Sequence, residues 1–175
     1  MSEPSSSPPT PLGQLLRDLD AAGVSAVICG GVACNIHGVD RVTHDLDLSL
    51  AFDHENLDRF VTVVERHGLR PRVPEPIGAL RDAERRRVWV EEKRAVVFTL
   101  QSDDGRMVVD VFLDYPVSHE ALVRDGMIPP AGSGRLRVSS IPHLIAAKHA
   151  VKPPREKDQR DIADLNAILK DGEDV

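Results

Sequence analysis

The sequence is poor in aromatic residues and cysteine and has no long hydrophobic run. Aromatics make up 3% of the 175 residues, too few for a platform on which successive nucleic-acid bases stack. The two cysteines, Cys29 and Cys34, are too few for a disulfide scaffold and, alone, for a structural zinc site, so we expect small, buried, reduced side chains. No apolar run approaches the roughly 20 residues that span a membrane. Residues 1–13 lack the charged start and apolar region of a signal peptide, so we expect a cytoplasmic protein without a membrane partner.

An excess of positive charge is also missing. The net charge is −6, from 22 basic and 28 acidic residues, which argues against bulk nucleic-acid packaging. Two segments run the other way: residues 81–94 have six basic and four acidic residues, and residues 148–160 have five and two. Such segments are more often solvated helix faces than phosphate sites, but a small RNA contact stays open.

The order of predicted elements indicates an α/β (α+β) fold, with a small mixed sheet flanked by helices and a helical C-terminal end. Residues 1–12, rich in Ser and Pro, are predicted to be a disordered tail, 13–138 the α/β core, and 139–175 a helical segment packed on it. Apolar spacing and turn residues predict helices over 11–22, 32–38, 54–68, 79–94, 117–126, 140–151 and 157–170, strands over 24–29, 45–50, 95–101 and 106–113, a loop over 70–80, and a loop with a short strand over 131–140.

Three carboxylates carry the strongest chemical signal. In "DLDLSL" (45–50) the residues alternate strictly, so Asp45 and Asp47 share one face of a strand whose other face is apolar. Two like charges inside an α/β layer need a partner, and a divalent metal such as Mg²⁺ would supply it. Asp110 is the only charge in "MVVDVFL", and beside this strand it would be a third ligand, since three carboxylates can hold two metals for phosphoryl transfer. The alternative is a salt bridge from Asp110 to an arginine.

Two further features fit phosphate chemistry. Gly30 and Gly31 stand between a strand and a helix, where they could let a phosphate approach the backbone or simply form a tight turn. Lys148 falls on the apolar stripe of its helix, and Asp158 and Asp161 extend the stripe of the next helix. Two accounts stay open: a snorkelling lysine with helix-start acids, or a lysine aimed at a phosphate with acids that orient it.

Together these residues resemble the nucleotidyltransferase fold superfamily, the DNA polymerase beta-like proteins. Its pattern is an apolar strand, Gly-Gly or Gly-Ser, then Asp-x-Asp on a second strand and a carboxylate on a later one. Here that pattern is Gly30-Gly31, Asp45-Leu46-Asp47 and Asp110. The segments "RVTHDLDL" and "HLIAAKHAVKPPREKDQRDIADL" are similar to the abortive-infection type nucleotidyltransferase toxins and their uncharacterised relatives.

The resemblance implies Mg²⁺-dependent transfer of a nucleoside monophosphate from a triphosphate such as ATP to an acceptor hydroxyl. Asp45, Asp47 and Asp110 would hold two metals and, with Lys148, form the catalytic group. The residues implied to bind nucleotide are Gly30, Gly31, Arg41, Thr43 and Lys148, and those implied to support the site are Arg155, Lys157, Asp158 and Asp161. Many members carry Ser after the first glycine, whereas Gly31 offers only its backbone N–H.

The acceptor and the biological role stay open at this point. An RNA end such as that of tRNA, a protein hydroxyl, or a small molecule such as an aminoglycoside would each serve as acceptor. A toxin with a cognate antitoxin and an antibiotic-modifying adenylyltransferase are both compatible with the resemblance. A different class, a nucleotide-binding or protein-interaction module without turnover, and a metal-dependent phosphohydrolase are the remaining alternatives.

Overall fold

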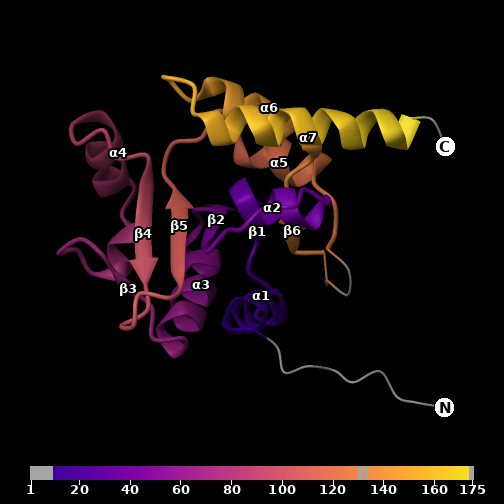
Figure 1. Ribbon diagram of the computed structural model, residues 1–175. Coiled ribbons are helices and arrows are strands. Elements are labelled where there is room, and N and C mark those ends of the chain that lie inside the picture. Colours follow the sequence, from indigo (N-terminus) through magenta and orange to yellow (C-terminus); the bar gives the residue numbers. More distant parts are fainter. Residues whose placement is uncertain (1–9, 130–131, 133, 174–175) are drawn as a thin grey trace, which may run out of the picture.

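The computed structural model describes residues 10–129, 132 and 134–173 (Figure 1). Most of the predicted tail, residues 1–9, lies outside this part. Helix α1 (Pro11–Ala21) already begins at Pro11, where the Thr10 side chain caps it by accepting the Gly13 N–H at 3.1 Å. Pro suits the first turn of a helix because its missing N–H would have no partner there, so α1 begins within the segment 1–12 that was predicted to be a tail.

One mixed sheet forms the centre of the molecule, as the sequence predicts. Its six strands are β1 (Ala26–Cys29), β2 (Asp45–Leu50), β3 (Arg70–Pro71), β4 (Val97–Gln101), β5 (Val108–Phe112) and β6 (Leu136–Val138). The strand order is β3-β4-β5-β2-β1-β6. The pairs β2–β5 and β1–β6 are parallel, and the other three pairs are antiparallel. Strand β2, from the first third of the chain, and β5, from its middle third, therefore lie side by side in the centre of the sheet.

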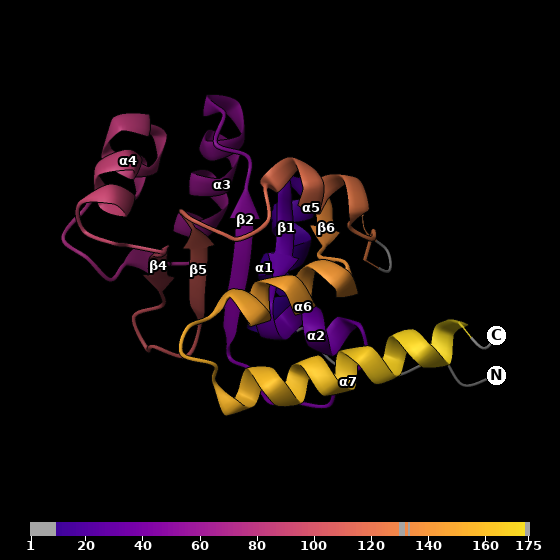
Figure 2. The same cartoon turned by 90° about the horizontal axis from the view of Figure 1, so that it is seen from above.

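Helices cover both faces of this sheet (Figures 1 and 2). Besides α1 they are α2 (Gly30–Ile36), α3 (His54–Arg66), α4 (Ala83–Glu91), α5 (His119–Asp125), α6 (Ile141–Ala150) and α7 (Glu156–Glu173), with a 3₁₀ helix η1 (Ile77–Arg81). Helices α1 and α3 pack against the apolar face of β2, where Leu46 and Leu48 are fully buried. Helix α5 packs on the opposite face, where Leu122 contacts Val27 and Cys29. Helices α6 and α7 lie side by side, and α6 also contacts α2.

The sequence predicts one continuous helix over 79–94, but the structure has two shorter helices there, η1 and α4. Asp82 has an extended backbone, and its side chain accepts the N–H groups of Glu84 and Arg85, so it starts α4 and ends the preceding 3₁₀ helix. The predicted loop over 70–80 also contains the short strand β3, where Pro71 is tolerated because β3 lies at the sheet edge.

The structure places both cysteines inside the fold. Cys29 and Cys34 are buried and free. No helix in the described part of the chain is long and apolar enough to cross a membrane.

Candidate active site

The turn between β1 and α2 brings the backbone into direct contact with charged side chains. Gly30 has a φ of +57°, and a Cβ on it would lie 1.9 Å from Asp47 Oδ2. A Cβ on Gly31 would lie 2.6 Å from Thr43 Oγ1 and 3.1 Å from Arg41 Cζ. Both positions therefore require glycine, and a serine at position 31 would force Thr43 to move. The turn is a tight one, and it is also the place where the backbone meets three predicted site residues.

The parallel pairing of β2 and β5 sets Asp47 directly beside Asp110. Asp110 Oδ1 accepts a hydrogen bond from Thr99 Oγ1 at 2.5 Å. Asp45 lies two residues before Asp47, on the same face but exposed at the start of the strand. No lysine or arginine in the described ranges forms an ion pair with Asp110, so the salt-bridge alternative is wrong there.

Burial and the neighbouring carboxylates together disfavour ionisation of Asp47. Burial raises the pKa of Asp47 to about 6, the negative charge of Asp110 adds to the rise, and the Gly31 backbone N–H partly opposes it. The negative charge of Asp110 thus disfavours ionisation of Asp47, and a bound cation would favour it.

The donor set of this pair fits a divalent cation. Mg²⁺ prefers carboxylate oxygens and keeps positions open for substrate phosphates. Within the described residues, no three His, Cys, Asp or Glu side chains are already gathered as a metal site. Of the three predicted metal ligands, Asp47 and Asp110 lie side by side, and Asp45 is exposed at the start of β2.

A second group of charges joins α6, α7 and the segment before β2. Lys148 Nζ donates to Asp161 Oδ2 at 2.5 Å and to Asp158 Oδ1 at 3.4 Å, and its side chain is only 9% exposed. Asp161 Oδ2 also accepts from Arg41, so one carboxylate oxygen holds two cations. Asp158 Oδ2 accepts from Arg155 Nε at 2.6 Å. Burial acts to raise the pKa of Asp158, but the Arg155 hydrogen bond and the Lys148 charge lower it overall.

This network argues against one of the two accounts of Lys148, that of a snorkelling side chain. The side chain does not snorkel to solvent; it is held inside by the two acids of α7, which are 3% and 4% exposed as residues. Asp161 also fixes Arg41 over the Gly31 turn, because the Arg41 guanidinium carbon lies 3.1 Å from where a Gly31 Cβ would be. The acids of α7 therefore position both cations beside the glycine turn.

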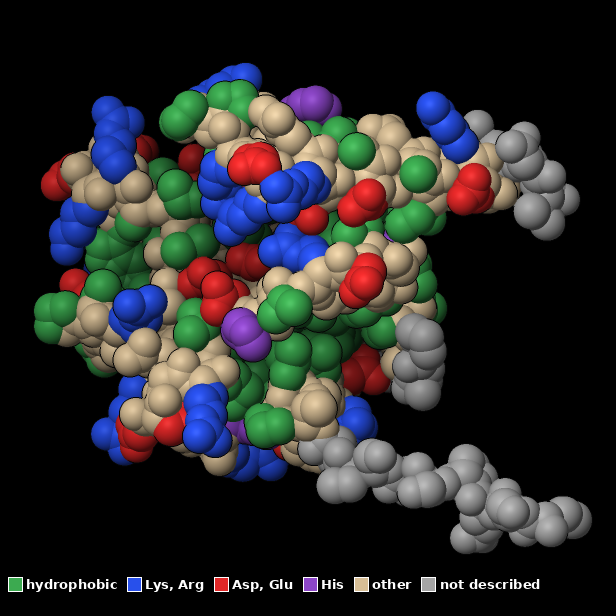
Figure 3. Space-filling model, viewed as in Figure 1, with side chains coloured by type: hydrophobic (Ala, Val, Ile, Leu, Met, Phe, Trp, Pro, Cys, Tyr) green, Lys and Arg blue, Asp and Glu red, His purple; other side chains and the backbone are tan. Residues whose placement is uncertain are grey.

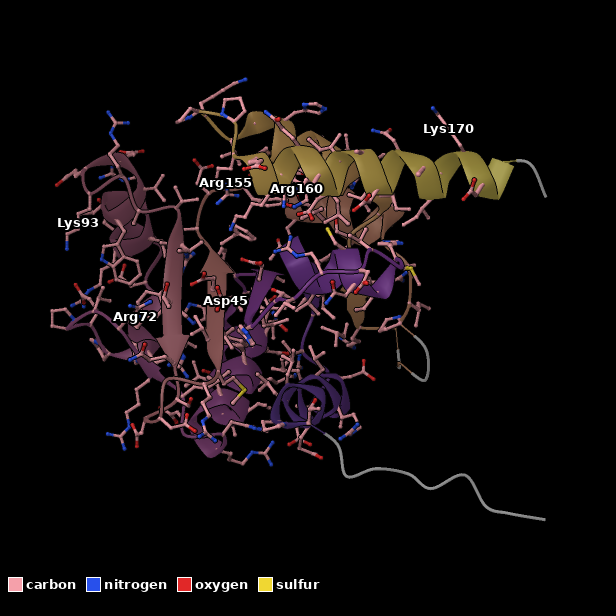
Figure 4. All side chains as sticks on the ribbon, in the orientation of Figure 1. Asp45, Arg72, Lys93, Arg155, Arg160 and Lys170 are labelled. Carbon is pink, nitrogen blue, oxygen red and sulfur yellow. The ribbon has the colours of Figure 1, made fainter. Side chains whose placement is uncertain are left out.

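The two groups face one another across a cavity of about 640 Å³, within the usual size range of small-molecule sites. Figure 3 shows acidic side chains at the centre of this face with Lys and Arg side chains directly above them, and Figure 4 places Asp45 by the strands and Arg155 on the α7 side. The predicted site residues on the cavity wall are Gly30, Asp47, Asp110, Lys148, Arg155 and Asp158.

Other predicted residues lie around this wall or away from it. Gly31, Arg41, Thr43 and Asp161 stand behind it, in contact with one another or with Lys148. Lys157 is exposed and makes no ion pair with any described residue, so the structure does not bring it into the group.

Sequence reasoning missed Thr99 and the aromatic part of the cavity. Phe112 and Tyr115 line it, with ring centroids 4.4 Å apart. Burial, and then the neighbouring Cys29, raises the pKa of Tyr115, so its hydroxyl stays protonated. The alternation in "AVVFTLQ" could place Thr99 on a strand face, but not opposite Asp110, since the strand register depends on the turn that joins the strands.

The family profile described as "Nucleotidyl transferase AbiEii toxin, Type IV TA system" matches residues 14–175. The chain belongs to the AbiEii family. It is a nucleotidyltransferase, and the predicted resemblance to abortive-infection type toxins is confirmed. No curated protein matches this AbiEii family member in sequence.

Two solved structures share the fold of this AbiEii-family nucleotidyltransferase. The crystal structure of ANT(2")-Ia in complex with adenylyl-2"-tobramycin has a TM-score of 0.53 and 19% identity, covering 91% of this chain and 90% of that one. The solution structure of the antibiotic-resistance factor ANT(2'')-Ia has a TM-score of 0.50 and 16% identity, covering 90% and 82%. At this identity the likeness shows the fold alone, which confirms the predicted nucleotidyltransferase fold.

Proposed function

We propose that this nucleotidyltransferase moves a nucleoside monophosphate from a nucleoside triphosphate to an acceptor hydroxyl in a Mg²⁺-dependent reaction. The observation that carries the proposal is the Asp47–Asp110 pair. These carboxylates lie side by side without a neutralising cation in the described residues, on the wall of a cavity whose opposite wall carries Lys148. A metal-bound triphosphate is the ligand that would compensate both groups of charges at once.

Each part of the site has a role in this scheme. Asp45, Asp47 and Asp110 would hold Mg²⁺ ions, two by analogy with the chemistry of such trios, and the ions would neutralise charge on the phosphates. Lys148, on the cavity wall, would neutralise the remaining charge of the triphosphate, and Arg41, which Asp161 holds behind the wall, would add positive charge near it. Because Gly30 lacks a side chain, a phosphate can come close to the backbone beside Asp47.

In the proposed transfer, one bond forms and one breaks at the α-phosphorus. The acceptor oxygen attacks the α-phosphorus, the bond from this phosphorus to the oxygen bridging to the β-phosphate breaks, and pyrophosphate leaves. The hydroxyl proton goes to Asp110 Oδ2, since Thr99 already donates to Oδ1. The protein contributes mainly by positioning groups and stabilising charge.

The acceptor and partners in this proposal are an RNA end, tRNA among them, and a cognate antitoxin in the cytoplasm. The antitoxin follows from the toxin–antitoxin description of the family. An RNA end is favoured over a cationic acceptor because the loop between α6 and α7 carries the exposed Lys152 and Arg155, of which Arg155 lines the cavity.

Label transfer tests this function. The protein is incubated with each α-labelled triphosphate, Mg²⁺, and separately with total RNA, a protein lysate or tobramycin. We expect label on RNA with the wild type and none with Asp47→Asn, while Lys170→Ala, changed at an exposed residue far along α7, labels RNA normally. Absence of label on every acceptor, or equal labelling by Asp47→Asn, would remove the proposal.

A further inference from the structure

A second cavity, of about 300 Å³, lies next to the first along β4. Val97 lines both cavities. The walls of the second are largely apolar and include Pro74, Trp89 and Leu113. Its place beside the candidate active site, and not its size, raises the question of what it holds.

The second cavity is connected to the chemistry through Thr99. This residue lines the cavity and donates its hydrogen bond to Asp110, the group that would receive the acceptor proton. In the sheet order, β4 lies on the side of β5 opposite to β2, whereas Gly30 and Lys148 lie on the side of Asp47. An in-line displacement needs the attacking and leaving oxygens on opposite sides of the phosphorus. With the triphosphate on the Gly30 side, the acceptor therefore comes in from the β4 side.

The charge of the second cavity selects among acceptors. Arg72 is exposed and forms no ion pair with the described residues. Lys93 is 61% exposed and lies 3.9 Å from Glu75, whose charge is shared with Arg85 at 3.2 Å. The lining thus keeps excess positive charge around apolar walls. Figure 3 shows this hydrophobic hollow beside the acidic centre, and Figure 4 places Arg72 and Lys93 at its edges.

We propose that this second cavity is the acceptor subsite and takes the nucleotide unit next to the reacting hydroxyl of a single-stranded RNA end. The base would lie between the apolar walls around Trp89, and its phosphate would meet Arg72 and Lys93. The same charges disfavour a polycation such as an aminoglycoside, because its ammonium groups would face Arg72 and Lys93. The inference rests on the proposed function, since it uses Asp110 as the point where the acceptor reacts.

The chain carries a built-in reporter for this subsite, because Trp89 is its single tryptophan. Titration of the wild type with a trinucleotide RNA is expected to change the Trp89 fluorescence to saturation, and tobramycin is expected to leave it unchanged. Arg72→Ala and Lys93→Ala should each weaken trinucleotide binding about tenfold, as for a lost charged hydrogen bond, and reduce the slope of log affinity against log salt by about one. Lys170→Ala, exposed at the far end of α7, is the matched control (Figure 4).

Kinetics separate this inference from the proposed function. Arg72→Ala should raise KM for the RNA acceptor about tenfold and leave KM for the triphosphate unchanged. Transfer to RNA by the wild type, with the same acceptor KM and fluorescence response in Arg72→Ala and Lys93→Ala, would overturn the subsite and leave the proposed function intact. Failure of all transfer would remove the proposed function, while the fluorescence titration would still decide whether the cavity binds RNA. A fluorescence response of the wild type to tobramycin as large as that to the trinucleotide, or label only on protein, would also overturn the subsite.

Discussion

Asp47→Asn is expected to stabilise the free protein at neutral pH while abolishing its activity. Asp47 has a pKa raised from its ordinary 3.8 to about 6. Its ionisation in the fold therefore costs about 3 kcal/mol at most, at about 1.4 kcal/mol per unit, and residual solvent screening brings this closer to 2 kcal/mol. Asparagine carries no charge and keeps a side-chain oxygen that can accept the Gly31 N–H. The variant should thus gain stability because it removes a repulsion that the function requires.

The sign of the pH dependence provides a second check on the same variant. A raised pKa means that the folded protein favours protonated Asp47. The stability that Asp47 contributes is therefore fully present below about pH 4 and is lost as the pH rises through about 6. The variant's advantage should be about 2 kcal/mol at pH 8 and should vanish towards pH 4. Urea unfolding in the presence of a chelator measures it, with Asp164→Asn, exposed on α7 away from this pair, as control. A variant less stable than the wild type at pH 8, or a difference independent of pH, would refute the reasoning.

Three further predictions concern the turn, the network and the metal. Gly30→Ala should lower the free energy of unfolding by about 3 kcal/mol because its Cβ would lie 1.9 Å from Asp47 Oδ2, whereas Gly105→Ala, with φ +69° and open space, should cost about 1 kcal/mol; urea unfolding compares them. Asp161→Ala should cost about 3 kcal/mol, since Lys148 and Arg41 lose their shared oxygen, and should raise KM for the triphosphate, while the exposed Asp164→Ala should do neither. Millimolar Mg²⁺ should raise the thermal midpoint of the wild type but not that of Asp47→Asn, and equal shifts would argue against a metal at this carboxylate.

Local pattern was enough to predict that Asp45 and Asp47 share one strand face and that Asp110 needs a partner, but not that Asp110 pairs with Asp47. Strict alternation in "DLDLSL" fixes which face Asp47 shares, and the isolation of Asp110 in an apolar strand indicates that it needs a nearby partner. Since a one-residue slip would turn Asp110 to the other face, burial of Val109 and Val111 enforces the register that sets it beside Asp47.

Long-range arrangements could not be predicted in the same way. The link from Arg41 to Asp161 joins residues 120 positions apart and depends on how α7 lies across α6, which periodicity does not specify. The spacing placed Lys148 on the apolar stripe of its helix, but it did not predict that Asp161 accepts its hydrogen bond. The break at Asp82 was missed because the residues on either side of it suit a helix, and only the competition of its side chain for backbone N–H groups ends one helix and starts another.

The most direct test of the central claim compares the fate of two labels on one triphosphate. With Mg²⁺ and a single-stranded RNA acceptor, the account predicts that α-labelled triphosphate transfers its label to the RNA end while γ-labelled triphosphate releases all of its label as pyrophosphate. Both signals should disappear in Asp110→Asn. Label from the γ position on the acceptor, release of free phosphate without pyrophosphate, or undiminished transfer by Asp110→Asn would contradict nucleotidyl transfer at this pair of carboxylates.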